Sequence, residues 1–257
     1  MTVFHAVTAD LEIDLPWPRP ESYNPAHATE PFLIWGGASS VGQYALQILK
    51  HWGYRNLFAT ASPSHHEFLR SLGATQVFDY RDPQVTELIL DAANRGKDTA
   101  TEPSVPFVLD CIGSKYGSIA PIAKIAQKGS KVAVLLPIIV RDSSDEVAPE
   151  YAMDVQAAAE WNEGVVARGV RTHFYLEVSI VLGLYRAFRY LTSLQNKLFA
   201  KSLQPEIMPA LLADGVVKPN RQRLVEGKTL LERAQKALDA LRRKEVSGER
   251  LVWRVSD

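Results

Sequence analysis

The stretch FLIWGGASSVGQYALQILK, Phe32 to Lys50, joins an apolar run, a turn of small residues and an amphipathic run. Four apolar residues are enough for a buried parallel strand. The amphipathic run carries apolar side chains at helical spacing, at Val41, Tyr44, Ala45, Ile48 and Leu49. This order predicts a strand, a tight turn and a helix.

The same alternation continues along the chain. Further apolar runs predict strands at 56–61, 75–80, 105–113, 130–137 and 170–176. Helical patterns separate them at 64–74, 83–94, 116–129 and 151–169. Alternating strands and helices form parallel sheets with helices on both faces. The sequence therefore predicts an α/β fold with a doubly wound, parallel, six-stranded Rossmann sheet.

Both ends of the chain differ from this pattern. Residues 1–29 contain four prolines, which predict an extended lead-in without a core of its own. Near the other end, 205–215 predicts a short helix and 227–245 a strongly amphipathic helix that begins with a capping box at Thr229 and Glu232. A last strand is expected at 250–255.

The composition excludes several classes of protein. Lys and Arg number 29, as do Asp and Glu, and this neutral balance argues against a nucleic-acid binder. The single cysteine excludes an intramolecular disulfide and a Cys-rich zinc site. No run of eighteen apolar residues and no signal pattern occurs, so we expect a cytoplasmic protein that does not enter a membrane.

The turn GGASSVG matches the G-x-G-x-x-G pattern of dinucleotide-binding domains. Gly37 takes the first place, Ser39 the middle place and Gly42 the third. The glycines permit a tight turn and close packing of helix on strand, and the following helix offers free N–H groups to a pyrophosphate. A tight turn without a ligand is the alternative, and cofactor binding is favoured because βαβ units follow.

The end of the second predicted strand indicates which nicotinamide cofactor is bound. NAD-binding domains place an acidic residue there, for the ribose 2′-hydroxyl. This chain has ATASPSHH instead, with no acid before Glu67. Ser62, Ser64 and His65 offer hydrogen bonds to a 2′-phosphate, which favours NADP(H), although Ser64 also suits an ordinary helix cap.

Other chemistries are less well supported. HHEFLR lacks the second histidine of a zinc-binding H-E-x-x-H motif, because Arg70 stands in its place, and we expect no metal site. Cys111 lies in an apolar strand, which is typical of a small core residue rather than a nucleophile. No serine lies in a G-x-S-x-G elbow.

Four segments together resemble the zinc-free medium-chain dehydrogenase/reductases. They are WGGASSVGQYALQILK, SLGATQVFDYRDPQV, VLDCIG and VSGERLVWRV. The nearest subgroup is the trans-acting enoyl reductases found beside fungal polyketide synthases. The resemblance implies a small-molecule or acyl-thioester substrate with a conjugated double bond. It also implies a polyketide synthase as a partner. A homodimer is one of the oligomeric states that the sequence leaves open.

The resemblance also implies positions around the cofactor. Ser39, Ser40, Val41 and Gly42 would hold the pyrophosphate, and Ser62, Pro63, Ser64 and His65 would surround the 2′-phosphate, with Tyr80 beside them. Leu135 and Leu136 would lie near the nicotinamide, which Val246 and Ser247 would approach from the end of the chain. The catalytic residues stay unassigned.

The chain departs from the family pattern before the glycine-rich turn. Family members carry about a hundred more residues there, which form most of a GroES-like catalytic domain. We therefore expect a truncated chain with a linker or catalytic-domain remnant at 1–29, an NADP(H)-binding domain at 30–176 and a return to the catalytic domain at 200–257. That return would expose apolar surface or pair with a partner.

A segment at 177–199 interrupts the expected connection. Its stretch 178–195 begins with Val-Ser and ends with Leu-Gln, residues that splice-site consensus sequences can encode. One hypothesis is a retained intron translated as an amphipathic helix, and the other is a genuine inserted interface helix.

Three functions follow from these patterns. The first is an NADPH-dependent enoyl reductase, whose activity in a truncated chain stays open. The second is a cofactor-binding remnant that regulates or scaffolds other enzymes without turnover. The third is a non-redox isomerase or cyclase that uses the same cleft.

Overall fold

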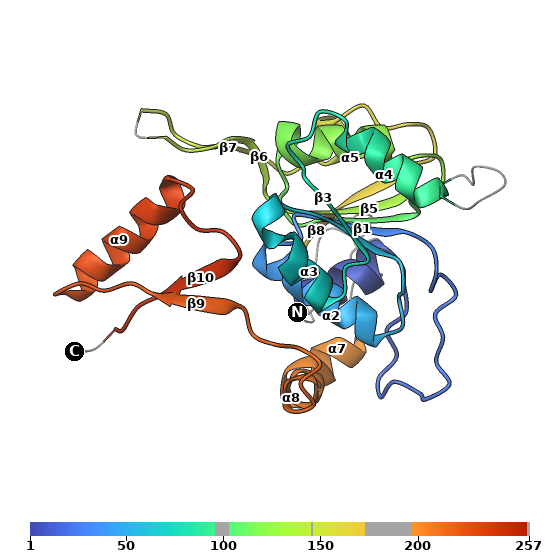
Figure 1. Ribbon diagram of the computed structural model, residues 1–257, viewed down its shortest axis with the longest axis horizontal. Helices are drawn as coiled ribbons and strands as arrows, with labels where there is room; N and C mark the ends of the chain where they lie inside the picture. Colours follow the sequence, from blue (N-terminus) through green and yellow to red (C-terminus); the bar gives the residue numbers. More distant parts are fainter. Residues whose placement is uncertain (96–102, 145, 173–196, 256–257) are drawn as a thin grey trace, which may run out of the picture.

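A six-stranded parallel sheet forms the centre of the protein (Figure 1). The computed structural model describes residues 1–257 except 96–102, 145, 173–196 and 256–257. The strands lie in the order β3-β2-β1-β4-β5-β8. Their bounds are Phe32–Trp35 (β1), Leu57–Thr60 (β2), Gln76–Phe78 (β3), Phe107–Asp110 (β4), Lys131–Leu135 (β5) and Val166–Val170 (β8). The predicted Rossmann sheet is confirmed.

Helices cover both faces of this sheet, and the strands β1, β2 and β4 are buried on both sides. One face packs against α1 (Thr2–His5), α2 (Ser40–His51), α3 (His66–Leu72), α7 (Lys197–Ser202) and α8 (Met208–Ala213). The other face packs against α4 (Val85–Asn94) and α5 (Ala120–Ile125). Short helical turns at η2 (Pro63–His65), η3 (Lys115–Ile119), η4 (Gln156–Ala158) and η6 (Leu203–Ile207) complete these layers.

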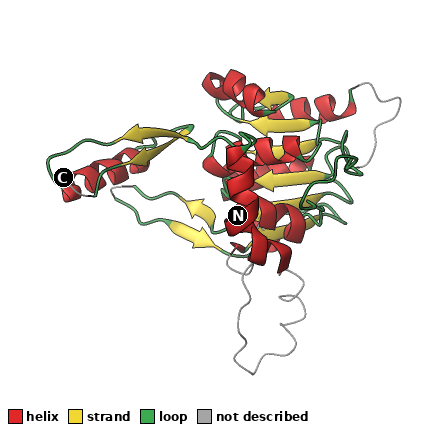
Figure 2. Cartoon of the chain, turned by 90° about the horizontal axis from the view of Figure 1, so that it is seen from below, coloured by secondary structure: helices red, strands yellow, loops and turns green. Residues whose placement is uncertain are grey.

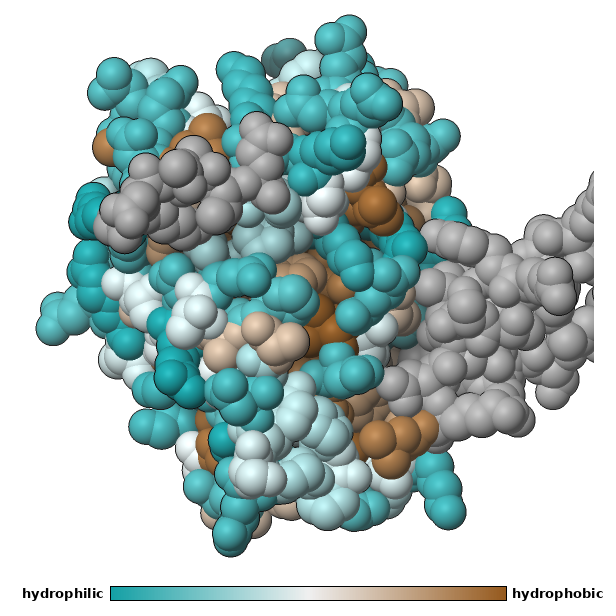
Figure 3. Space-filling view, turned by 90° about the vertical axis from the view of Figure 1, so that its right-hand side faces the viewer, coloured by the Kyte–Doolittle hydropathy of each residue, from teal (hydrophilic) through white to brown (hydrophobic). Residues whose placement is uncertain are grey.

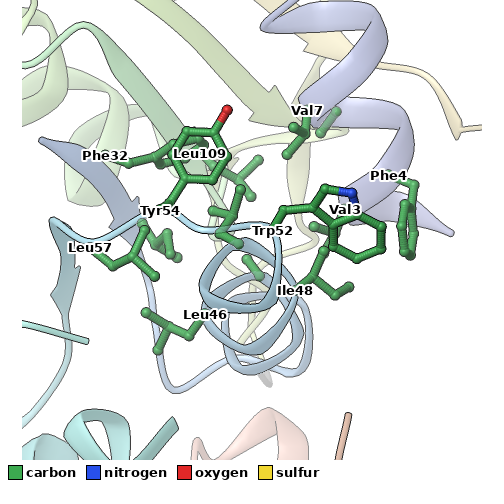
Figure 4. Packing of buried hydrophobic residues seen from close by; sticks show 14 of the residues in the cluster. Val3, Phe4, Val7, Phe32, Leu46, Ile48, Trp52, Tyr54, Leu57 and Leu109 are labelled. Atoms are coloured by element: carbon green, nitrogen blue, oxygen red, sulfur yellow. The ribbon is translucent and has the colours of Figure 1, made fainter. Parts of the chain in front are cut away.

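The first fifteen residues are part of the core, so the expected extended lead-in is wrong there. Residues 2–10 form α1 and η1 (Ala6–Asp10), and their apolar side chains are buried. All four prolines come later, and apolar residues recur at helical spacing before them. Phe4 packs edge-on against Trp52 at the end of α2, with ring centroids 5.7 Å apart (Figure 4).

Residues 151–176 also differ from the prediction of a long helix followed by a strand. They contain the end of β7 (Glu150–Ala152), the short turn η4 and the sixth sheet strand β8. β7 pairs antiparallel with β6 (Ile138–Arg141) in a hairpin that the sequence pattern did not predict. The alanines of this region favoured helix, but Asn162 caps the end of α5 and Gln156 donates to Ala167 O, which holds the chain in turns.

The last part of the chain forms an arm beside the sheet domain (Figures 1 and 2). It consists of β9 (Arg221–Leu224), α9 (Leu230–Arg242) and β10 (Glu249–Val252), with β9 and β10 paired in parallel. Thr229 caps α9 by accepting from Glu232 N, as the capping box predicts. The arm and the β6–β7 hairpin extend from the same side of the sheet domain.

The arm exposes apolar side chains. In α9, Leu231 is 77% exposed, and Leu230, Leu238 and Leu241 are also exposed. The face of the molecule turned away from the arm is mostly hydrophilic outside its grey segments, with small separate apolar patches (Figure 3). Within the described part of the chain, no helix has the length and apolarity needed to cross a membrane. The inserted segment 178–195 lies outside the described residues, so neither hypothesis about it is tested.

We expect Phe4→Ala to lower the free energy of unfolding by about 3–5 kcal/mol, because it removes a fully buried ring between Trp52 and Phe199. Urea unfolding followed by tryptophan fluorescence measures this effect. The control Leu231→Ala removes an exposed side chain and should change stability by no more than about 0.5 kcal/mol. Equal stability of the two variants would contradict the placement of α1 in the core.

Candidate cofactor site

The turn after β1 is anchored by the end of β2. Gly36 N donates to Thr60 Oγ1 at 2.9 Å, and Gly37 N donates to Thr60 O at 2.8 Å. Gly36 has φ of +82°, so it is this glycine that supplies the positive φ of the turn, while Gly37 lies against Ala59. A Cβ on Gly42 would lie 2.4 Å from Gly36 O, so only glycine fits at the third motif position.

Helix α2 begins directly after this turn. Ser39 is its N-cap and accepts a hydrogen bond from Gly42 N at 3.1 Å. The next N–H groups, at Ser40 and Val41, belong to the first turn, which has no intrahelical acceptors. No acidic residue occupies this first turn. The positive end of the helix dipole therefore remains available to an anion.

A cavity of about 600 Å³ opens at this turn. The sheet domain lines it through the carboxyl ends of β1 and β2 and the loop after β4, at Trp35, Gly36, Ala38, Ser39, Ser40, Thr60, Ala61, Ser62, Tyr80, Ile112, Ser114 and Gly117. The hairpin contributes Ile139 and Asp142, and the arm contributes Leu241, Lys244, Val246, Ser247, Gly248 and Glu249. Because the order of the strands reverses between β1 and β4, the cavity lies where doubly wound sheets bind ligands.

The arm is attached over this cavity by polar contacts. Lys244 Nζ lies 2.6 Å from Asp142 Oδ2 of the hairpin segment, and Gln43 Nε2 donates to Gly248 O at 3.1 Å. Ser247 Oγ and His65 Nε2 are 2.8 Å apart. A Cβ on Gly248, which has φ of +72°, would lie 2.7 Å from His65 Cε1, so glycine permits this close approach.

The structure brings together residues that the sequence analysis assigned to opposite ends of the cofactor. Ser247 was expected near the nicotinamide and His65 near the 2′-phosphate, yet the two side chains are hydrogen-bonded. Ser62 Oγ lies 3.4 Å from Ser64 Oγ at the same edge. In this arrangement Ser247 is placed to serve the same end of a ligand as Ser62 and His65.

The predicted site residues fall into two groups. Six line the cavity: Ser39, Ser40, Ser62, Tyr80, Val246 and Ser247. The others do not line it: Gly37, Val41, Gly42, Pro63, Ser64, His65, Leu135 and Leu136. Gly37, Val41 and Gly42 belong to the turn after β1 and the first turn of α2. Leu136 packs against Gly169 of β8. The roles assigned to all of these residues stay predictions.

Sequence reasoning missed several cavity residues. Thr60 ends β2 and holds both glycines, and Ile112 and Ser114 follow β4 at the same sheet edge. Their position after predicted strands was the available signal, since ligands bind beyond the carboxyl ends of parallel strands. Asp142 and Lys244 had no such signal, because they lie 102 residues apart and meet only in the folded chain.

Asp110 holds the loop that carries Ile112 and Ser114. It is fully buried, and its Oδ1 accepts from Ile112 N at 2.9 Å and Gly113 N at 3.1 Å. Its Oδ2 accepts from Ser118 Oγ at 2.6 Å. Burial raises the pKa of Asp110 to about 6, although these three hydrogen bonds oppose the rise.

The Cys111 thiol lies in the loop that follows β4. Burial and the neighbouring Asp110 raise the pKa of the Cys111 thiol, which disfavours the thiolate that a nucleophile needs. Across the described residues, no cluster of three or more His, Cys, Asp or Glu side chains is placed to hold a metal ion.

The raised pKa of Asp110 predicts a pH effect on stability. The folded protein holds this proton more tightly than the unfolded chain, so the stabilisation is full below about pH 4 and is lost as pH rises through about 6. Asp110→Asn removes the titration. Relative to this variant, wild type should lose up to about 3 kcal/mol of unfolding free energy between pH 4 and 7. Urea unfolding at each pH measures it, and a constant difference would contradict the prediction.

Comparison with known sequences finds similarity to trans-enoyl reductases over part of their length. No family model matches the chain. It is 35% identical over 130 residues to trans-enoyl reductase tazE of Aspergillus terreus, which covers 47% of this chain and 42% of the relative. It is 27% identical over 232 residues to trans-enoyl reductase fsa3 of a Fusarium species, which covers 90% of this chain and 57% of the relative. The chain thus spans less than two thirds of either relative.

Solved structures share the fold. CurA from Vibrio vulnificus, solved in complex with NADPH, matches with a TM-score of 0.55 and 16% identity over 100% of this chain and 63% of that chain. The Etr1p/NADP/crotonyl-CoA complex matches with a TM-score of 0.53 and 15% identity over 98% of this chain and 59% of that chain. Over the matched residues the chain is similar in sequence to fungal trans-enoyl reductases, and it shares the fold of these solved structures.

Proposed function

We propose that this chain binds NADPH in the cavity beside Ser39 and supplies the cofactor-binding part of an enoyl reductase. The observation that carries this proposal is the positive end of α2, whose Ser40 and Val41 N–H groups have no intrahelical acceptor, at a cavity of about 600 Å³ in a relative of trans-enoyl reductases. The substrate class is a carbon–carbon double bond conjugated to a carbonyl, to which the bound cofactor would supply a hydride.

The residues at the turn fit a dinucleotide. The missing side chain of Gly42 lets the turn close against α2, and the N–H groups of Ser40 and Val41 are free of intrahelical acceptors. The Ser39 hydroxyl is fixed by its hydrogen bond from Gly42 N. These groups suit a pyrophosphate, since they offer donors and a positive dipole without a competing carboxylate.

The residues at the end of β2 fit a 2′-phosphate better than a ribose hydroxyl pair. Ser62 lines the cavity, and His65 lies behind it on Ser247. The acid expected of an NAD site is missing at this position. Glu249 does line the cavity, but it forms an ion pair with Arg223 at 3.1 Å, which reduces its repulsion of a phosphate.

The arm gives the cavity a wall that limits water. Leu241 and Val246 place apolar groups against it, and the Lys244–Asp142 pair ties this wall to the hairpin segment. Water exclusion strengthens the electrostatic interactions that position a reacting group. The chain's own contribution to reduction is therefore orientation of the cofactor and partial closure of the cavity.

A second candidate is cofactor binding without turnover. Reduction of a conjugated double bond ends with protonation of carbon, which needs a proton donor near the substrate. Two described cavity residues carry a titratable proton donor. Lys244 forms an ion pair with Asp142, and Tyr80, which follows β3, is half exposed to solvent. This shortage of a free proton donor favours a binding module that regulates or scaffolds other enzymes.

The substitution Ser62→Asp tests the cofactor preference. We expect wild type to bind NADPH more tightly than NADH in calorimetric titration. The added carboxylate should weaken NADPH binding at least about tenfold, because it repels the 2′-phosphate, and should strengthen NADH binding through the ribose 2′-hydroxyl. The control Thr75→Asp adds the same charge at the amino end of β3, on the opposite edge of the sheet. Tighter NADH binding by wild type would overturn the preference.

Turnover separates the two candidates. Wild type is mixed with NADPH and crotonyl-CoA, and absorbance at the reduced nicotinamide band is followed with product analysis. Consumption of NADPH with formation of the saturated thioester supports the reductase. Tight NADPH binding with no consumption across a panel of enoyl thioesters supports the binding module, and absence of binding contradicts both.

A further inference from the structure

A second and larger cavity lies away from the cofactor site. Its volume is about 760 Å³, and it lies where the chain returning from α8 to β9 passes α2 and α3 (Figure 1). Its lining residues are Arg19, Gln43, Gln47, Lys50, His51, Phe68, Ser71, Leu72, Gly215, Val216, Lys218, Pro219 and Arg221. None of them lines the cofactor cavity. The two cavities are therefore separate candidate sites.

The charge of this lining is entirely positive. Arg19 comes from the N-terminal segment, Lys50 from α2, and Lys218 and Arg221 from the returning chain, and no carboxylate lines the cavity. None of these four has a carboxylate oxygen within 4.0 Å among the described residues. Cations gathered without counter-ions repel one another, so an anion bound between them would be stabilised.

The positive charge of the cavity also affects His51, which lines the same wall. Burial and the nearby Arg19 lower the pKa of His51, and Asp214 opposes this effect. Asp214 does not line the cavity. One carboxylate outside the wall leaves the four cations in excess.

The backbone that carries the cations is fixed in place. Gln47 Oε1 accepts from Lys218 N at 2.7 Å, and Gln47 Nε2 lies 3.4 Å from Lys218 O, which holds the returning chain on α2. The Arg221 guanidinium lies over the Phe68 ring, 4.6 Å from its centroid. The Lys50 stem packs against Gly73, where an added Cβ would lie 2.8 Å from Lys50 Cδ. These contacts keep the cations around the cavity before any ligand binds.

A buried amide lies between two of the cations in the sequence. Asn220 is 6% exposed, and both its Nδ2 and its Oδ1 lack a hydrogen-bond partner among the described residues. An unpartnered buried amide costs about 1–3 kcal/mol of stability, so such groups are uncommon without a ligand or water. Asn220 does not itself line the cavity, but it lies in the returning chain between Lys218 and Arg221, which do.

We propose that this cavity binds a small molecule carrying two or more phosphate groups, at a site independent of the NADPH site. Guanidinium and ammonium groups are the side chains that bind phosphate most strongly. One phosphate carries too little charge to balance four cations spread over three segments around about 760 Å³, so a multiply charged ligand fits the lining better. Nucleotides and inorganic polyphosphate share this chemistry.

The test measures binding of tripolyphosphate and of adenosine 3′,5′-bisphosphate by calorimetry at low ionic strength. The variant Lys50→Gln/Lys218→Gln/Arg221→Gln keeps side-chain stems but removes three charges. It should bind both probes at least about tenfold more weakly than wild type and bind NADPH unchanged. The control Arg70→Gln removes one exposed charge of α3 that does not line the cavity, and it should leave all three affinities unchanged.

Each result decides the proposal. Tighter binding of the bisphosphate than of tripolyphosphate assigns a nucleotide ligand, and the reverse assigns a polyphosphate. Failure of both probes to bind folded wild type, or equal binding by the triple variant, overturns the site. If the triple variant loses NADPH affinity as strongly as it loses affinity for the two probes, the second site is not independent of the NADPH site, and that part of the proposal is overturned. Failure of NADPH to bind any variant contradicts the proposed function alone.

Discussion

The double hydrogen bond from the turn after β1 to Thr60 is the constraint from which the cofactor site is built. Thr60 receives Gly36 N on its hydroxyl and Gly37 N on its carbonyl, so the turn is fixed to the end of the neighbouring strand. Gly42 can then approach Gly36 O closely, and Ser39 can cap α2. Loss of this geometry would move the positive helix end away from the cavity that it faces. The site lies at the carboxyl edge of the sheet, where the strand order reverses between β1 and β4.

The arm completes the cofactor cavity without a large apolar interface. Its contacts with the sheet domain include one ion pair and hydrogen bonds from Gln43 and His65, while Leu231 and its neighbours on α9 remain exposed. Polar contacts at a surface are individually weak, so they orient an element more than they stabilise it. The arm therefore depends on the sheet domain for its placement, and the sheet domain depends on the arm for one wall of the cavity.

The sequence predicted the elements with strong local signals and missed those decided by packing. The apolar runs of β1 to β5 and the capped helices α2 and α9 were recognised, because their periodicity and caps act over a few residues. The helix at 2–5 was not predicted, because its buried side chains are stabilised by distant residues of the core, which include Trp52 and Phe199. The alanines near 157 favoured a helix that hydrogen bonds to α5 and β8 prevent. At the site, the turn was recognised, and Thr60, Ile112 and Lys244 were not.

The sequence by itself determined that a glycine-rich turn joins a buried strand to an amphipathic helix, because glycine spacing and apolar period are local properties. It also determined the missing acid at the end of β2, and hence the preference proposed for NADPH. Only the tertiary structure decided that Ser247 meets His65 across 182 residues, and that Arg19, Lys50, Lys218 and Arg221 surround one cavity. These long-range contacts depend on how the returning chain packs across α2 and α3, which no local sequence pattern determines.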